Sequence, residues 1–164
     1  EILDEGIDIV IKPTAEGLAN MGEFVTNMHT ESGLINEFEH GLELADAEQI
    51  VLEYVKRFVP EARTAPLAGN TIGTDRMFIN RYMPQLDSHL HYRNIDVSSV
   101  KELSRRWYPR VYFNMPKKDG GHRALADILE SIKELQYYRK TVFVDQPGPT
   151  SEVAKSAADS LDRD

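Results

Sequence analysis

Ala65-Pro66-Leu67-Ala68-Gly69-Asn70-Thr71-Ile72-Gly73-Thr74-Asp75 is the stretch of this 164-residue chain that decides its fold class. Its apolar beginning has the length of a buried strand, and a turn that contains glycine follows. Asp75 then falls near the start of a helix that we expect to end before Pro84. A strand that leads through a short turn into a helix is the repeating unit of α/β proteins, whose ligands gather where the strands end.

Strands and helices alternate on both sides of this stretch. Strands are predicted over residues 6–12 and 92–97, and helices over residues 18–28, 45–59, 100–107 and from just after His122 to about residue 138. Ser98 or Ser99 is expected to cap the helix that begins at residue 100. Residues 109–121 are expected to form a loop. We therefore predict one α/β domain over residues 1–144, followed by a disordered acidic tail over residues 145–164, where Pro, Gly, Ser, Ala and Asp dominate.

Charge and composition limit the classes of function. The net charge of −8 is uneven: residues 1–60 carry 13 acids and 3 bases (−10), whereas residues 101–123 carry 7 bases and 2 acids (+5). One basic segment on an acidic protein suits a ligand with few phosphates better than a long nucleic acid. A solvated charged face would explain the same segment. Cysteine is absent, which excludes disulfides and thiolate metal sites and agrees with the cytoplasmic location that we expect.

Several signatures are missing from the sequence. No apolar run reaches membrane-spanning length, and no signal-peptide pattern opens the chain. A Walker-type phosphate loop, a dinucleotide-binding glycine motif and a nucleophile elbow are also absent. Nucleoside triphosphatase, dehydrogenase and hydrolase-triad functions therefore have no support.

His122 and Asp127 combine a group that titrates near neutral pH with a carboxylate that can bind a metal ion. On one continuous helix they would point about 140° apart, so they converge only if His122 lies in the loop before the helix. The preceding pair Gly120-Gly121 allows such a loop. The spacing alone proves little, because chance supplies about one such pair and His91 and Asp96 share it.

Other candidate residues have an ordinary structural explanation when each is taken alone. Asp75 is explained better as a helix cap than as a metal ligand. His29 and Phe24 fit a surface and a core position of one helix. The cluster His91-Tyr92-Arg93 suits an interface or a phosphate contact, and an ordinary strand edge equally well.

Five motifs follow one another in a fixed order along the chain. They are Asn70-Thr71-Ile72-Gly73-Thr74-Asp75-Arg76, His91-Tyr92-Arg93-Asn94-Ile95-Asp96-Val97-Ser98, Lys101-Glu102-Leu103, Arg106-Trp107-Tyr108-Pro109 and His122-Arg123-Ala124-Leu125-Ala126-Asp127. Together they resemble oligoribonucleases, the branch of the DEDDh 3′→5′ exonucleases that degrades small RNAs. The resemblance implies a ribonuclease H-like fold, with a mixed β-sheet flanked by helices, and a homodimer. It also implies two divalent ions, Mg²⁺ or Mn²⁺, held by four carboxylates.

The resemblance assigns catalytic roles to three residues. Asp75 and Asp127 match the third and fourth metal-binding carboxylates, and His122 matches the general base. One ion would lower the pKa of a water that His122 deprotonates, and the hydroxide would attack the terminal phosphodiester. The second ion would stabilise the leaving 3′ oxygen, and 5′-mononucleotides would be released.

Contacts with the substrate are implied in the same way. The matching positions are Asn70 and Thr71 near the scissile nucleotide, Phe24 in place of a base-stacking Trp, and His29 and Ser98 at the terminal phosphate. His91, Tyr92 and Arg93 match a segment that reaches into the active site of the partner subunit. A closed pocket of this kind would explain a preference for RNAs of a few nucleotides, from dinucleotides upward.

One motif of the family is not found. Members begin with a strand that bears an Asp-x-Glu pair, and Glu1-Ile2-Leu3-Asp4-Glu5 does not match it. Two of four carboxylates would bind metal weakly, so we expect an upstream segment to supply the other pair and the first two strands. The alternative is a catalytically inactive, truncated form that dimerises and binds short oligonucleotides.

Overall fold

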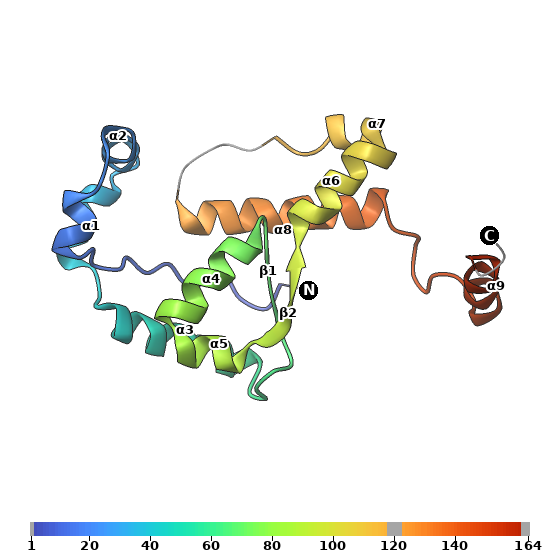
Figure 1. The fold of residues 1–164 in the computed structure, drawn as a ribbon, viewed down its shortest axis with the longest axis horizontal. Coiled ribbons are helices and arrows are strands. Elements are labelled where there is room, and N and C mark those ends of the chain that lie inside the picture. Colours follow the sequence, from blue (N-terminus) through green and yellow to red (C-terminus); the bar gives the residue numbers. More distant parts are fainter. Residues whose placement is uncertain (1, 118–122, 162–164) are drawn as a thin grey trace.

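The computed structural model describes residues 2–117 and 123–161, which form an α/β structure. In chain order its elements are α1 (Ala15–Ala19), α2 (Glu23–Glu31), the 3₁₀ helix η1 (Leu34–His40), α3 (Leu44–Phe58), β1 (Pro66–Gly69), α4 (Ile72–Tyr82), α5 (Pro84–His89), β2 (His91–Asp96), α6 (Val97–Trp107), α7 (Pro109–Phe113), α8 (Ala124–Thr141) and α9 (Ser151–Leu161) (Figure 1). None of the described helices is long and apolar enough to cross a membrane.

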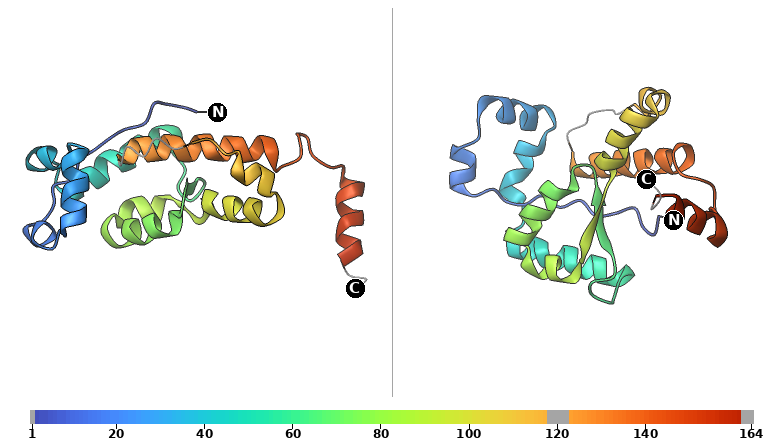
Figure 2. Two further views of the ribbon diagram at one scale, coloured as in Figure 1. Left: turned by 90° about the horizontal axis from the view of Figure 1, so that it is seen from above. Right: turned by 45° about the vertical axis from the view of Figure 1, so that its right-hand side comes forward.

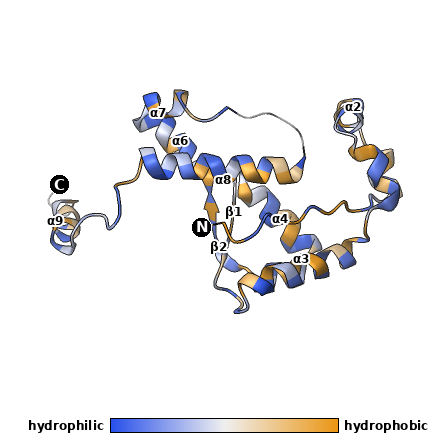
Figure 3. Cartoon of the chain, turned by 180° about the vertical axis from the view of Figure 1, so that it is seen from behind, coloured by the Kyte–Doolittle hydropathy of each residue, from blue (hydrophilic) through white to orange (hydrophobic). Residues whose placement is uncertain are grey.

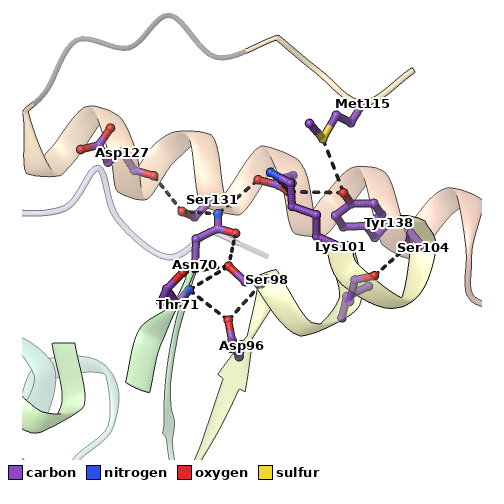
Figure 4. Close-up of polar contacts among 12 residues, drawn as sticks. Asn70, Thr71, Asp96, Ser98, Lys101, Ser104, Met115, Asp127, Ser131 and Tyr138 are labelled. Atoms are coloured by element: carbon purple, nitrogen blue, oxygen red, sulfur yellow. Dashed lines mark hydrogen bonds and ion pairs between the residues drawn. The ribbon is translucent and has the colours of Figure 1, made fainter. Parts of the chain in front are cut away.

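The sheet of the described residues consists of β1 and β2, which run parallel. Gly69 lies opposite Asp96, so both strands end at the same edge. Helix α4 begins just beyond β1 and helix α6 directly follows β2. Helix α8 passes beside this edge and contacts both β1 and α6 (Figures 1 and 4). The first turns of α4 and α6 and the middle of α8 therefore lie close together at the carboxyl ends of the strands.

The apolar core lies at the other side of the sheet, between α3 and α5. Leu52 of α3 and Leu86 and Leu90 at α5 are buried together. Val51, Val55, Leu67, Ile79 and Met83 pack against them. Helix α3 alternates hydrophobic and hydrophilic residues along its length (Figure 3), as expected for a helix with one buried face. This packing holds α4 and β2 in place, because α5 connects them.

Two parts of the chain lie away from the sheet. Helices α1, α2 and η1 form one group, and α9 stands alone at the opposite end (Figures 1 and 2). Every residue of α9 is exposed. Ala, Lys, Glu and Leu in its sequence favour a helix without tertiary contacts. Helix α9 lies within residues 145–164, the segment that we predicted to be a disordered acidic tail. The division of the chain into a domain and a tail remains a prediction.

Six predicted elements are confirmed to within a few residues: α3, β1, α4, β2, α6 and α8. The helix predicted over residues 18–28 is divided into α1 and α2, with a break around Met21-Gly22. Residues 109–121 were expected to form a loop, but Pro109–Phe113 forms α7. Proline is well accommodated in the first turn of a helix, which has no use for its missing N–H.

The strand predicted over residues 6–12 is wrong for the described structure. Only Ile11 makes a bridge, to Leu42. The alternation of Ile7, Ile9 and Ile11 suits a strand, but a strand also needs a neighbour that pairs along its whole length, and residues 6–9 have no strand partner among the described residues.

Candidate active site

A cavity of about 550 Å³ opens at the carboxyl end of β1, between α4 and α8. Asn70 lies at its floor, directly after the strand. Asp75 enters from α4 and Asp127 from α8, and Glu130 and Ser131 of α8 also line it. Apolar side chains from the same elements complete the wall. The structure therefore brings Asn70, Asp75 and Asp127 together around one cavity, although they lie up to 57 residues apart in the sequence.

Asp75 and Asp127 occupy equivalent positions in their helices. Each is the acidic residue of a first turn, and both are exposed. The amide dipoles at a helix N-terminus favour negative charge, so each helix presents its positive end to this cavity. Neither side chain forms an ion pair or hydrogen bond with another described residue. Two free carboxylates at one cavity have the chemistry of a cation site.

Thr71 connects β1 to α4 in a left-handed conformation, with φ 53° and ψ 33°. This region is unfavourable for a β-branched residue, by about 1–3 kcal/mol. The Thr71 amide donates to Asp96 Oδ1 at 3.0 Å and to Ser98 Oγ at 2.9 Å. These bonds hold the turn that leads from Asn70 into the helix of Asp75.

Asp96 caps helix α6, in contrast to the prediction that Ser98 or Ser99 does so. Its Oδ1 accepts from the Ser98 amide at 2.9 Å, and its Oδ2 accepts from Ser99 Oγ at 3.2 Å. The helix begins at Val97, three residues earlier than predicted, because the aspartate at the end of β2 already supplies an acceptor. Ser98 is thereby left to bond with Asn70 and Thr71.

Asn70 lies at the centre of a polar network (Figure 4). Its Nδ2 donates to Ser131 Oγ at 2.9 Å and to Glu134 Oε2 at 3.2 Å, and its Oδ1 accepts from Ser98 Oγ at 3.1 Å. Ser131 and Glu134 were not predicted as site residues. The sequence contains a pattern that could have indicated them. A polar stripe with helical spacing runs along α8 and consists of Asp127, Ser131, Glu134 and Tyr138.

Tyr138 closes the far end of this stripe. It is fully buried, and its hydroxyl donates to Glu134 Oε1 at 3.3 Å. Burial, together with the neighbouring Glu134 carboxylate, raises the pKa of Tyr138 well above its ordinary value. The phenol therefore stays neutral and serves as a hydrogen-bond donor at any physiological pH.

Phe24 and His29 are not brought to this cavity. Both lie on α2, which stands apart from α4 and α8 (Figures 1 and 2). Phe24 is 80% exposed. The His29 ring packs edge-on against Phe38 of η1, 5.8 Å between ring centroids, and its buried Nδ1 has no hydrogen-bond partner among the described residues.

His91, Tyr92 and Arg93 form a surface cluster on β2. The rings of His91 and Tyr92 are stacked at 4.5 Å, and the Arg93 guanidinium lies 5.3 Å from the centroid of the Tyr92 ring. Tyr92 is 73% exposed. None of the three is among the residues that line the cavity.

His122, the predicted general base, lies outside the described residues. Its neighbour Arg123 precedes α8 and donates to Glu37 of η1 at 2.8 and 3.2 Å, with Asp8 at 3.8 Å. The Arg123 guanidinium lowers the pKa of the Glu37 carboxyl. This pair is the link between the start of α8 and the group that carries α2.

Comparison with known proteins agrees with the five motifs. Residues 1–135 match the exonuclease family of RNase T type. An oligoribonuclease of Leifsonia xyli is 66% identical over 160 residues, which cover 98% of this chain and 77% of the relative. The chain belongs to the oligoribonuclease family of exonucleases. Oligoribonucleases of Streptomyces griseus (59% identity; 98% and 80% covered) and Rhodococcus jostii (61%; 93% and 78%) are similarly related.

Exonucleases of this family depend on divalent metal ions, and two carboxylates of this cavity fit such an ion. Asp75 and Asp127 offer the hard oxygen ligands that Mg²⁺ and Mn²⁺ prefer. Within residues 2–117 and 123–161, no three His, Asp or Glu side chains are grouped closely enough to surround one ion. Asp75 and Asp127 would therefore hold an ion only together with further ligands.

Proposed function

We propose that this chain is a 3′→5′ exoribonuclease that degrades very short RNA oligonucleotides to 5′-mononucleotides. The observation that carries this proposal is the cavity at the strand ends, which Asp75, Asp127 and Asn70 all line. Membership of the oligoribonuclease family supports the reaction and the substrate class. We further propose a cytoplasmic location, a homodimer, and a ribonuclease H-like sheet of which β1 and β2 form part.

In the proposed mechanism, Asp75 and Asp127 would contribute ligands to divalent ions, Mg²⁺ or Mn²⁺. When bound, such ions lower the pKa of a water molecule and neutralise charge on the leaving oxygen. His122 takes the proton from the attacking water, because an imidazole accepts protons near neutral pH. Asn70 and Thr71 orient the scissile nucleotide, so that its phosphorus is in line with the attacking oxygen.

The other substrate contacts belong to the same proposal. Ser98 would bind the terminal phosphate from the first turn of α6, and its hydroxyl proton, which points to Asn70 Oδ1 in this structure, would then turn to a phosphate oxygen. Phe24 would stack on a base and His29 would bind the phosphate, which requires α2 to lie nearer to the cavity when RNA is bound. The exposed ring of Phe24 agrees with a stacking role.

The test is hydrolysis of a linear ribodinucleotide by the full-length protein with Mn²⁺, followed by separation of the products. We expect mononucleotides from the wild type and none from His122→Ala. A deoxyribodinucleotide, the control substrate, should be cleaved more slowly. Binding of the ribodinucleotide without any product would instead support the non-catalytic alternative.

The homodimer is tested by complementation. Tyr92→Ala and Asp127→Asn proteins should each be inactive alone if Tyr92 acts in the site of the partner. Co-expression gives mixed dimers in which one site of two has both residues, so about a quarter of wild-type activity should return. No recovery in isolated mixed dimers would contradict the shared site.

A further inference from the structure

Glu134 is a buried carboxylate beside the cavity to which the mechanism above gives no role. It is 3% exposed. Its Oε1 lies 3.4 Å from Lys101 Nζ and accepts from the Tyr138 hydroxyl, while its Oε2 accepts from Asn70 Nδ2. Burial of a carboxylate is unfavourable unless a cation and hydrogen bonds compensate for the lost water. The structure supplies both, at the point where α8 meets α6 and the end of β1.

The chemistry of these groups determines how the Asn70 amide is oriented. A carboxylate accepts hydrogen bonds and cannot donate them, so the amino end of Asn70 must face Glu134. Ser131 requires the same orientation, since its own proton goes to the Asp127 carbonyl oxygen at 2.8 Å. Its Oγ is therefore the acceptor for the second Asn70 N–H. The carbonyl end of Asn70 is left facing Ser98 (Figure 4).

A rotated Asn70 would disrupt this arrangement on both sides. Its Oδ1 would lie against the Glu134 carboxylate, where two acceptors repel, and its amino group would face the Ser98 hydroxyl. Glu134 is the strongest acceptor in the set because it carries a full charge. Glu134 therefore selects one orientation of the Asn70 amide, and this orientation makes the Ser98 hydroxyl the donor to Asn70 Oδ1.

We propose that Glu134 is a positioning residue of the active site, which sets the direction of the hydrogen bonds through Asn70 to Ser98 and keeps α8, with Asp127, in register with β1. The expected effect of Glu134 on catalysis rests on the proposed function. The expected effect of Glu134 on the orientation of the Asn70 amide does not.

Glu134→Gln tests the proposal, because glutamine keeps the size of the side chain but can either donate or accept. Glu48→Gln is the matched control: Glu48 is 5% exposed and accepts from the amides of Gln85 at 2.7 Å and Leu86 at 3.2 Å, away from the cavity. Both variants should lower Tm. Only Glu134→Gln should lower kcat at saturating ribodinucleotide with Mn²⁺, by about tenfold to a hundredfold. Glu134→Gln leaves Lys101 without the carboxylate it pairs with. Adding Lys101→Met removes that unpaired cation and should restore Tm without restoring kcat.

A second measurement is independent of catalysis. The side-chain NH₂ of Asn70, assigned by its loss in Asn70→Asp, should exchange its protons with solvent faster in Glu134→Gln than in the wild type and in Glu48→Gln. Unchanged exchange would overturn the proposal, as would a kcat equal to that of Glu48→Gln. A wild type that releases no mononucleotide would refute the proposed function, while the exchange measurement would still decide the role of Glu134.

Discussion

Replacement of Asp96 by alanine should weaken both the fold and the site. Asp96 Oδ1 accepts from the amides of Ser98 and Thr71, and Oδ2 accepts from Ser99 Oγ. Loss of the cap of α6 should cost about 1 kcal/mol. The bond to Thr71 is exposed, so water recovers part of it and its loss should add about 1 kcal/mol. The free energy of unfolding should fall by about 2 kcal/mol, and Tm by about 4–8 °C for a chain of this size.

Activity should fall as well, because the same carboxylate holds the strained turn at Thr71. With Ser98 Oγ as its one remaining acceptor, the Thr71 turn can leave the left-handed region more easily and displace Asn70, so kcat/KM on a ribodinucleotide should decrease by about tenfold or more. Urea unfolding followed by circular dichroism, and product release with Mn²⁺, measure the two effects.

Two controls separate the turn from helix capping in general. Thr14→Ala removes the cap of α1, where Thr14 Oγ1 accepts from the Gly17 amide at 3.0 Å, and should leave kcat/KM unchanged. Asp96→Asn keeps an acceptor of similar capping strength and should lose less than about 1 kcal/mol. The reasoning would be refuted if Asp96→Ala unfolded with the free energy of the wild type and kept its kcat/KM.

Two further predictions concern the carboxylates and the ion pair at α8. Asp75→Asn and Asp127→Asn should each abolish detectable turnover and weaken Mn²⁺ binding in calorimetry, because an amide lacks the charge that holds the ion. Unchanged Mn²⁺ affinity in both variants would contradict the assignment of these two residues as metal ligands. Arg123 lowers the folded-state pKa of Glu37 below its ordinary value of 4.5. The ion pair therefore stabilises the fold fully at pH values above 4.5, and this stabilisation is lost as the pH falls through the folded-state pKa. Arg123→Ala should therefore flatten the acid limb of the curve of stability against pH, and an identical curve would show that the pair does not form in solution.

The sequence alone was sufficient for the elements whose signals are local. Helices α3 and α8 follow from their apolar stripes, and β1 followed by α4 from a short apolar run and a turn. The order of the motifs along the chain also indicates the family. These features depend on neighbours within a few residues, which is the range that periodicity and turn chemistry report.

The tertiary structure decided what depends on partners distant in the chain. Residues 6–12 have the alternation of a strand, yet only Ile11 finds a bridge, because pairing is a property of two segments. Asp96 caps α6 in place of the serines, because the end of β2 places its carboxylate over the first turn. Asn70 and Glu134 meet only because α8 crosses the strand ends 64 residues later in the chain. The resemblance of the motifs to the family indicated which carboxylates share the cavity, but only packing could show that a buried carboxylate, Glu134, contacts the Asn70 amide beside them.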